Sequence, residues 1–245
     1  MSAISRANPL ILFDIDGTLL KTGDPHHGAA FTHAFESIYG KPVTLDGVPL
    51  AGMLDAQIAR ILFERHGLDE DASSVRLGEM MEMMGTRYID ALAGGSLVER
   101  LLPGVTEAVL ACFERDWTAG VLTGNARSVG HAKLRAANLD TLLSIGAFGD
   151  SASDRGHLVE AALDDAERVT GVRHHPEEAV LIGDTPNDIS AARLGGARVV
   201  AVATGRFGVD ALSHHNPDAL LPDLSDTQAF VAAVQAALSK RPLSS

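Results

Sequence analysis

Cysteine and long hydrophobic runs are scarce in this sequence. Its 245 residues include one cysteine, Cys112, so a scaffold held together by internal disulfides is excluded. The longest apolar stretch near the start runs from Pro9 to Phe13, whereas a membrane-spanning helix needs about 18 apolar residues. The start also lacks the basic region and long apolar run of a secretory signal. We therefore expect a soluble, cytoplasmic protein.

Positive charge is also in short supply. Lysine and arginine number 20 against 32 aspartates and glutamates, which gives a formal net charge of −12. Such a surface repels polyanions on average, so we expect no nucleic-acid partner, and a phosphorylated ligand would need a local basic group. The sequence contains no Gly-x-Gly and no Gly-x-x-x-x-Gly-Lys. These absences exclude the dinucleotide-binding fingerprint and the P-loop.

What the sequence does contain is a series of short apolar runs bounded by turn residues, each typical of a buried parallel strand. They are Leu10–Phe13, Gly120–Leu122, Ala179–Ile182 and Val199–Val202. Helical patterns lie between the later runs, near residues 106–115, 129–137, 156–170 and 187–194, and a last amphipathic pattern covers 225–239. This alternation predicts an α/β fold, a Rossmann-like doubly wound parallel sheet.

An insertion interrupts the alternation early in the chain. Residues 23–96 contain three helical stretches, near 26–39, 55–66 and 73–92, and no convincing strand. Glycine and proline mark its start at Gly23–Pro25, and two glycines mark its end at Gly94–Ser96. We predict a core domain made of residues 1–22 and 97–245 and an inserted all-helical cap domain of residues 23–96. Its two linkers would let the cap move as a lid.

Polar clusters follow three of the predicted strands. The first is Asp14-Ile15-Asp16-Gly17-Thr18, in which two carboxylates two residues apart on an extended chain point the same way. Such close charges resist joint ionisation unless a metal ion or a proton relieves one of them. An ordinary turn would explain the aspartates and the glycine separately, but it would not explain their position after a buried strand.

The other two clusters offer groups that bind phosphate and cations. Thr123-Gly124-Asn125 supplies a hydroxyl, a side-chain amide and backbone N–H groups that glycine leaves open. Gly183-Asp184-Thr185-Pro186-Asn187-Asp188 places two aspartates four residues apart at the start of a helix. One of them could be a helix cap, and the other needs a different explanation. Since parallel strands end at the same edge of a sheet, we expect the three clusters to meet there.

These motifs, in this order, resemble the haloacid dehalogenase superfamily. Asp14–Thr18 is similar to the first motif of that family, Thr123–Asn125 to the second and Gly183–Asp188 to the fourth. Arg155 stands where the family places its third-motif basic residue, usually lysine. The resemblance covers roughly residues 8–205 and extends to the helical insertion, which looks like the cap of phosphoglycolate phosphatase-like members.

The resemblance implies a Mg²⁺-dependent phosphatase that hydrolyses a small phosphorylated metabolite through an aspartyl-phosphate. Asp14 would be the nucleophile and Asp16 the general acid and base. The metal ligands would be the carboxylates of Asp14 and Asp184 and the backbone carbonyl of Asp16. For the general acid to work, the pKa of Asp16 should lie above that of its metal-bound neighbour.

The remaining motif residues would hold the phosphoryl group. Thr123, Gly124, Asn125 and Arg155 would contact its oxygens, and Asp188 would steady Arg155 or the metal site. Two further cations, at positions 127 and 133 after the second motif, are the fallback candidates for the phosphate-facing positive charge, although both fit a solvated helix face better. We expect no membrane partner and either a monomer or a homodimer.

Several other functions remain open. A phosphomutase of the β-phosphoglucomutase type would use the same core residues, and a binding protein could keep the fold without the chemistry. A dehalogenase would not need Asp16. A phosphonate hydrolase of the family would need a cap lysine, and near the cap loop that contains Asp55 the sequence offers only Lys21 and Lys41. The histidine pairs lack the spacing of a zinc site.

Overall fold

A six-stranded parallel sheet forms the centre of the protein in the computed structural model, which describes residues 8–150 and 155–240. The strand order is β3-β2-β1-β4-β5-β6, and every neighbouring pair is parallel. The strands are β1 (Leu10–Phe13), β2 (Thr118–Leu122), β3 (Ile145–Ala147), β4 (Ala179–Gly183), β5 (Arg198–Val202) and β6 (Ala219–Leu221). The chain winds outward from β1 in both directions, which confirms the predicted doubly wound α/β fold.

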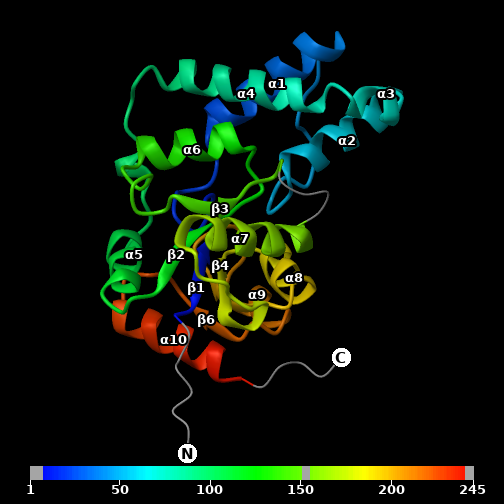
Figure 1. Ribbon diagram of the computed structural model, residues 1–245. Helices are drawn as coiled ribbons and strands as arrows, with labels where there is room; N and C mark the ends of the chain where they lie inside the picture. The colour runs from blue at the N-terminus through cyan, green and yellow to red at the C-terminus, as the bar shows by residue number, and fades with distance from the viewer. Residues whose placement is uncertain (1–7, 151–154, 241–245) are drawn as a thin grey trace, which may run out of the picture.

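Helices cover both faces of this sheet (Figure 1). α5 (Val105–Phe113) and α10 (Thr227–Ser239) pack on one face, and α7 (Arg155–Thr170) and α8 (Pro186–Leu194) pack on the other. Strands β1 to β5 are almost completely buried, which explains why their sequences are continuous apolar runs instead of alternating ones, whereas β6 at the edge is partly exposed. A short helix, α9 (Val209–Ser213), leads to the edge strand β6.

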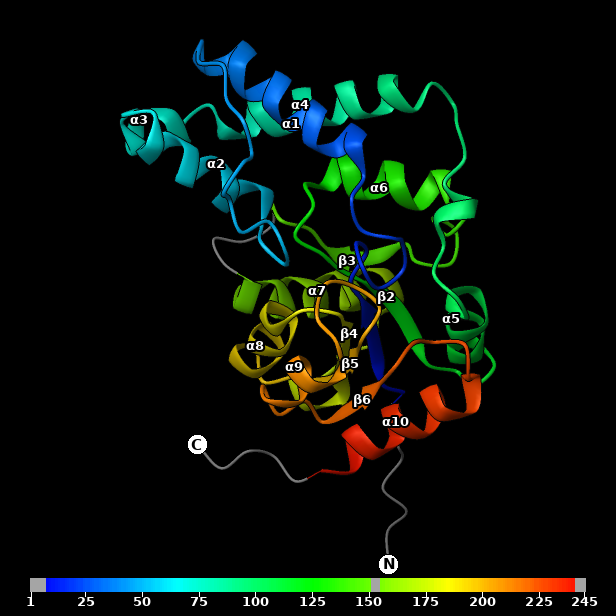
Figure 2. The ribbon, with the colours of Figure 1, turned by 180° about the vertical axis from the view of Figure 1, so that it is seen from behind.

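The inserted segment forms a separate helical layer beyond the carboxyl ends of the strands (Figures 1 and 2). Its helices are α1 (Pro25–Tyr39), α2 (Asp55–Arg65), α3 (Glu70–Ser74) and α4 (Leu77–Leu92). They enclose an apolar cluster of their own that contains Phe35, Phe63 and Tyr88. α6 (Arg127–Ala136) of the core lies against α4 and contributes Val129 to this cluster. The domain boundaries at residues 22/23 and 96/97 remain a prediction.

The sequence patterns miss three short elements and merge two others. β3 and β6 have three residues each, and α9 has five, so none is long enough to show a period. The helical pattern expected over residues 73–92 divides into α3 and α4, because the chain turns at Val75 and Arg76. In the part of the chain that the structure describes, no helix is long and apolar enough to cross a membrane.

Candidate active site

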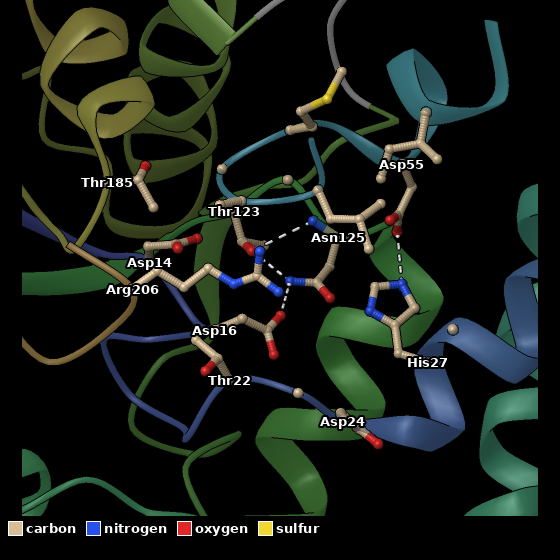
Figure 3. Close-up of a pocket in the computed structure, with 18 of the residues that line it drawn as sticks. Asp14, Asp16, Thr22, Asp24, His27, Asp55, Thr123, Asn125, Thr185 and Arg206 are labelled. Carbon is tan, nitrogen blue, oxygen red and sulfur yellow. Dashed lines mark hydrogen bonds and ion pairs between the residues drawn. The ribbon is translucent and has the colours of Figure 1, made fainter. Parts of the chain in front are cut away.

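The three polar clusters meet at the carboxyl ends of β1, β2 and β4, as their positions after the strands predict. Asp14 follows β1 and donates its backbone N–H to Ile182 of β4, at 2.9 Å. Thr123 follows β2 and donates its backbone N–H to Ala147 of β3, at 3.1 Å. Between these strand ends and the helical layer lies a cavity of about 210 Å³, shown in Figure 3. Core and cap therefore enclose the site together.

Three buried aspartates lie close together at the site, and two of them, Asp14 and Asp184, line the cavity. Carboxylate oxygens of Asp14, Asp184 and Asp188 all lie within 4.8 Å of one another. The pKa of Asp14 is raised to about 7, mainly by burial and by the negative charge of Asp188. The positive charge of Arg155 lowers this pKa in part, and the negative charge of Asp16 raises it slightly. Burial, followed by the charges of Asp188 and Asp14, raises the pKa of Asp184 to about 8. A hard cation with oxygen ligands would relieve this repulsion, so the donor set fits Mg²⁺.

Glycine makes room for Asp184 in this cluster. A Cβ atom at Gly17 would lie 2.3 Å from the Asp184 Oδ2 atom, and the φ angle of Gly17 is +100°. The backbone of the first motif therefore passes directly over the carboxylate of the fourth. The Thr18 hydroxyl also approaches the Asp184 Oδ1 atom, at 3.4 Å. No other residue type would fit this position without displacing the carboxylate.

Arg155 is the cation next to the aspartate cluster. It begins α7 and is 7% exposed. Its Nη2 atom lies 2.8 Å from the Asp188 Oδ1 atom and 3.5 Å from the Asp14 Oδ1 atom. Its Nη1 atom donates to the carbonyl oxygen of Gly52 in the cap. One guanidinium thus contacts two of the three aspartates and the cap loop.

The second cluster connects its own side chains to Asp16. The Asn125 Nδ2 atom donates to the Thr123 Oγ1 atom at 2.7 Å and to the Asp16 Oδ2 atom at 2.9 Å. Gly124 lies directly beneath the cap, because its carbonyl accepts the backbone N–H of Asp55 at 2.9 Å. A Cβ atom at Gly124 would lie 2.1 Å from the carbonyl oxygen of Met53. The Thr123-Gly124-Asn125 motif therefore lines the pocket and also contacts the cap.

The expectation that Lys133 lies on a solvated face is wrong. Lys133 is 1% exposed, and its Nζ atom lies 2.8 and 2.6 Å from the two carboxylate oxygens of Asp16. Burial alone would raise the pKa of Asp16, but the charge of Lys133 and the hydrogen bonds from Lys133 and Asn125 lower it. The pKa of Asp16 is thus lowered, whereas that of Asp14 is raised. The spacing from Val129, one helical turn earlier, is the signal that could have located this lysine on the buried face of α6.

Arg127, the other cation after the second motif, does lie at the surface. It is exposed, and its guanidinium carbon is 4.8 Å from the centre of the Phe148 ring. It does not line the cavity.

The cap and a later core loop supply pocket residues that the sequence patterns did not identify. His27 of α1 and Asp55 of α2 line the cavity (Figure 3), and the His27 Nε2 atom lies 3.1 Å from the Asp55 Oδ2 atom. That oxygen also accepts the backbone N–H of Ala126 at 2.7 Å. Arg206 lines the cavity from the loop after β5. None of these residues belongs to a strand-end cluster, so only the folded structure locates them at the site.

Comparisons with known proteins agree with this architecture. The sequence model of the haloacid dehalogenase-like hydrolases matches residues 11–193. The pyrophosphatase PpaX of Bacillus pumilus is 24% identical to this chain over 91% of the chain and 96% of that protein. A phosphoglycolate phosphatase of Agrobacterium fabrum is 26% identical over 89% of the chain and 90% of that protein. A crystal structure of β-phosphoglucomutase from Clostridium difficile superposes with a TM-score of 0.67 at 13% identity, covering 95% and 99% of the two chains.

Proposed function

Because the chain belongs to the haloacid dehalogenase-like hydrolases, we propose that it is a Mg²⁺-dependent phosphatase that hydrolyses a small phosphorylated metabolite through an aspartyl-phosphate on Asp14. The observation that carries the proposal is the convergence of the three strand-end clusters on one cavity, with Asp14 close to the buried Asp184 and Asp188. The names of the curated relatives, a pyrophosphatase and a phosphoglycolate phosphatase, support the same class of substrate.

The nucleophile would be the carboxylate of Asp14. It would attack the phosphorus atom while the bond to the leaving oxygen breaks, and the phosphoryl group would remain on the aspartate. Arg155 and the hydroxyl of Thr123 would hold the phosphoryl oxygens, together with the backbone amides near Gly124 and Asn125. The carboxylates of Asp14 and Asp184 and the carbonyl of Asp16 would hold Mg²⁺. When bound, this ion reduces the repulsion between the attacking carboxylate and the phosphate.

Asp16 would move the protons of both half-reactions. In the first it gives a proton to the leaving oxygen, which departs as an alcohol or an acid. In the second it takes a proton from the water that attacks the aspartyl-phosphate, which releases inorganic phosphate and regenerates the Asp14 carboxylate. Its position supports this role, because Asp16 lines the cavity and its side chain remains 31% exposed.

The cavity favours a small substrate with a second anionic group. Its volume of about 210 Å³ suits a small molecule. Apolar side chains of the cap, including Phe31 and Ile58, form part of its wall, whereas Arg206 lines it from the core. A carboxylate or a second phosphate close to the reacting one would pair with Arg206. Pyrophosphate and phosphoglycolate both have such a group.

Release of inorganic phosphate tests the proposal directly. We expect the purified protein to hydrolyse p-nitrophenyl phosphate, phosphoglycolate or pyrophosphate with Mg²⁺ and to lose this activity in excess chelator. The same reactions should be run with a hexose 1-phosphate and its bisphosphate, and the sugar products analysed. Formation of hexose 6-phosphate without phosphate release would instead support the phosphomutase alternative. Absence of both reactions would contradict an enzymatic function.

A further inference from the structure

Lys133 is a buried cation next to the site, and the roles proposed above do not use it. Its ammonium group lies within 3.2 Å of four acceptors: both carboxylate oxygens of Asp16, the Asn125 Oδ1 atom at 2.8 Å and the His27 Nδ1 atom at 3.2 Å. Asp16, Asn125 and His27 line the cavity, but Lys133 does not. The lysine is therefore placed to act on the reaction through its neighbours and not by touching the substrate.

We propose that Lys133 is a positioning residue that fixes the ionised carboxylate of Asp16 for proton transfer from the attacking water. An aspartate has two side-chain torsions, and a partly exposed carboxylate samples several orientations unless donors hold it. Lys133 contacts both oxygens from the buried side, and Asn125 holds one of them from a second direction. Together these donors define the plane of the carboxylate and direct it at the pocket.

Lys133 also fixes the orientation of the two other side chains it contacts. A lysine ammonium only donates hydrogen bonds, so it requires the carbonyl oxygen of the Asn125 amide to face it. The Asn125 Nδ2 atom is then directed to Thr123 and Asp16. For the same reason His27 must present an unprotonated Nδ1 atom, which leaves its Nε2 atom to donate to Asp55. A single cation thus sets the donor pattern of the second motif and of the cap histidine.

A purely structural ion pair between α6 and the loop after β1 is the competing explanation. The two explanations differ in which chemical step they affect. A displaced Asp16 would slow the hydrolysis of the aspartyl-phosphate, which requires a base, more than its formation from p-nitrophenyl phosphate, whose leaving group departs without a proton. A loss of structure would reduce both steps equally. The inference rests on the proposed function, so wild-type activity must be established first.

The experiment measures steady-state turnover of p-nitrophenyl phosphate and, by mass spectrometry after acid quench, the fraction of enzyme that carries a phosphoryl group. For Lys133→Met we expect turnover to fall at least about tenfold while the phosphorylated fraction rises. Asp16→Asn should show the same pattern, and the double variant should be no slower than Asp16→Asn alone, since both changes affect one group. Arg135→Met, on the exposed side of the same helix, is the matched control and should match wild type.

Each outcome decides a different claim. If wild type neither releases phosphate nor forms a phosphoenzyme, the proposed function fails. If wild type is active and Lys133→Met retains at least about half of its turnover, or loses turnover and phosphoenzyme in parallel, the positioning role is wrong. Should Lys133→Met fail to melt cooperatively, Lys133→Gln replaces it, because its amide can give Asp16 one hydrogen bond without a charge. Turnover and the phosphorylated fraction of Lys133→Gln are then compared with wild type by the same criteria.

Discussion

Asp14 and Asp184 are the side chains whose ionisation dominates the energetics of the site. Both are buried near Asp188, and their pKa values are raised from 3.8 to about 7 and about 8. Between about pH 4 and about pH 8, Asp14 and Asp184 of the folded protein still hold protons that the same residues of the unfolded chain have released. Its free energy of unfolding therefore decreases as the pH rises from about 4 to about 8.

We predict that Mg²⁺ stabilises the protein more at high pH than at low pH. At about pH 5 the ion must displace protons from Asp14 and Asp184, whereas at about pH 8 it binds carboxylates that are already ionised. Melting temperatures measured with and without Mg²⁺ should differ little at the lower pH and clearly at the higher one. Asp184→Asn should remove most of the difference. A Mg²⁺ effect independent of pH would contradict the assignment of these ligands.

The predicted roles of the arginines can be separated by substitution. Arg155→Ala should lower both substrate affinity and turnover, by about 100-fold or more in kcat/KM, because it removes the guanidinium next to Asp14 and Asp188. Arg127→Ala should leave both close to wild type, since Arg127 does not line the cavity. Steady-state kinetics with p-nitrophenyl phosphate show which of the two variants loses more kcat/KM. The opposite ranking would mean that Arg155 is not the third-motif cation.

Arg206 should affect only substrates that have a second anionic group. For Arg206→Ala we expect KM for phosphoglycolate or pyrophosphate to rise about tenfold. For p-nitrophenyl phosphate, which has no such group, KM should change little, so this substrate is the internal control. Equal effects on all three substrates would show that Arg206 contacts the reacting phosphate or maintains the loop.

At the scale of elements, the motifs that follow strands were predictable, whereas residues on the sides of two helices were missed. Asp14, Thr123 and Asp184 each follow an apolar run directly, so the edge at which parallel strands end places them together. Lys133 and His27 reach the site from the sides of α6 and α1. The position of His27 depends on how the cap packs on the core, which no local pattern of residues records. The spacing of Lys133 from the apolar Val129 does indicate the buried face of α6, but it does not show that this face reaches Asp16.

The loop of residues 51–55 is the element that joins cap and core at the site. The Asn187 Nδ2 atom donates to the carbonyl of Ala51 at 3.0 Å, Arg155 donates to that of Gly52, and Asp55 donates its N–H to Gly124. These contacts close the cavity from the cap side. All three core residues that hold the loop belong to the predicted motifs, which couples the position of the cap to the chemistry.

Gly124→Ala should interfere with this closure. The added methyl group would overlap the carbonyl of Met53, 2.1 Å away, so the cap loop would have to withdraw from the site. We expect kcat/KM for phosphoglycolate to fall at least about tenfold with a small change in melting temperature. Gly78→Ala is the matched control, because a Cβ atom there meets nothing within 4 Å. Unchanged activity in Gly124→Ala would show that tight contact of the loop is not required.

At the scale of the whole molecule, an acidic chain concentrates a few cations where an anion has to bind. The net charge of −12 repels phosphorylated compounds at long range, yet Arg155 and Arg206 line the cavity and Lys133 lies behind it. The sheet holds the reacting groups, and the helical layer limits the size of the ligand. We keep as a prediction that this layer moves as a lid, since closure would exclude bulk water from the transferring group.

The measurement that tests the central claim most directly is the mass of the protein during turnover. We predict that wild type, quenched in acid with Mg²⁺ and p-nitrophenyl phosphate present, gains one phosphoryl group, and that peptide mapping locates it on Asp14. Asp14→Asn should gain none and should turn over at less than about 1% of the wild-type rate, with an unchanged melting curve showing that the fold is intact. A phosphoryl group on another residue, or turnover by Asp14→Asn close to wild type, would contradict the account.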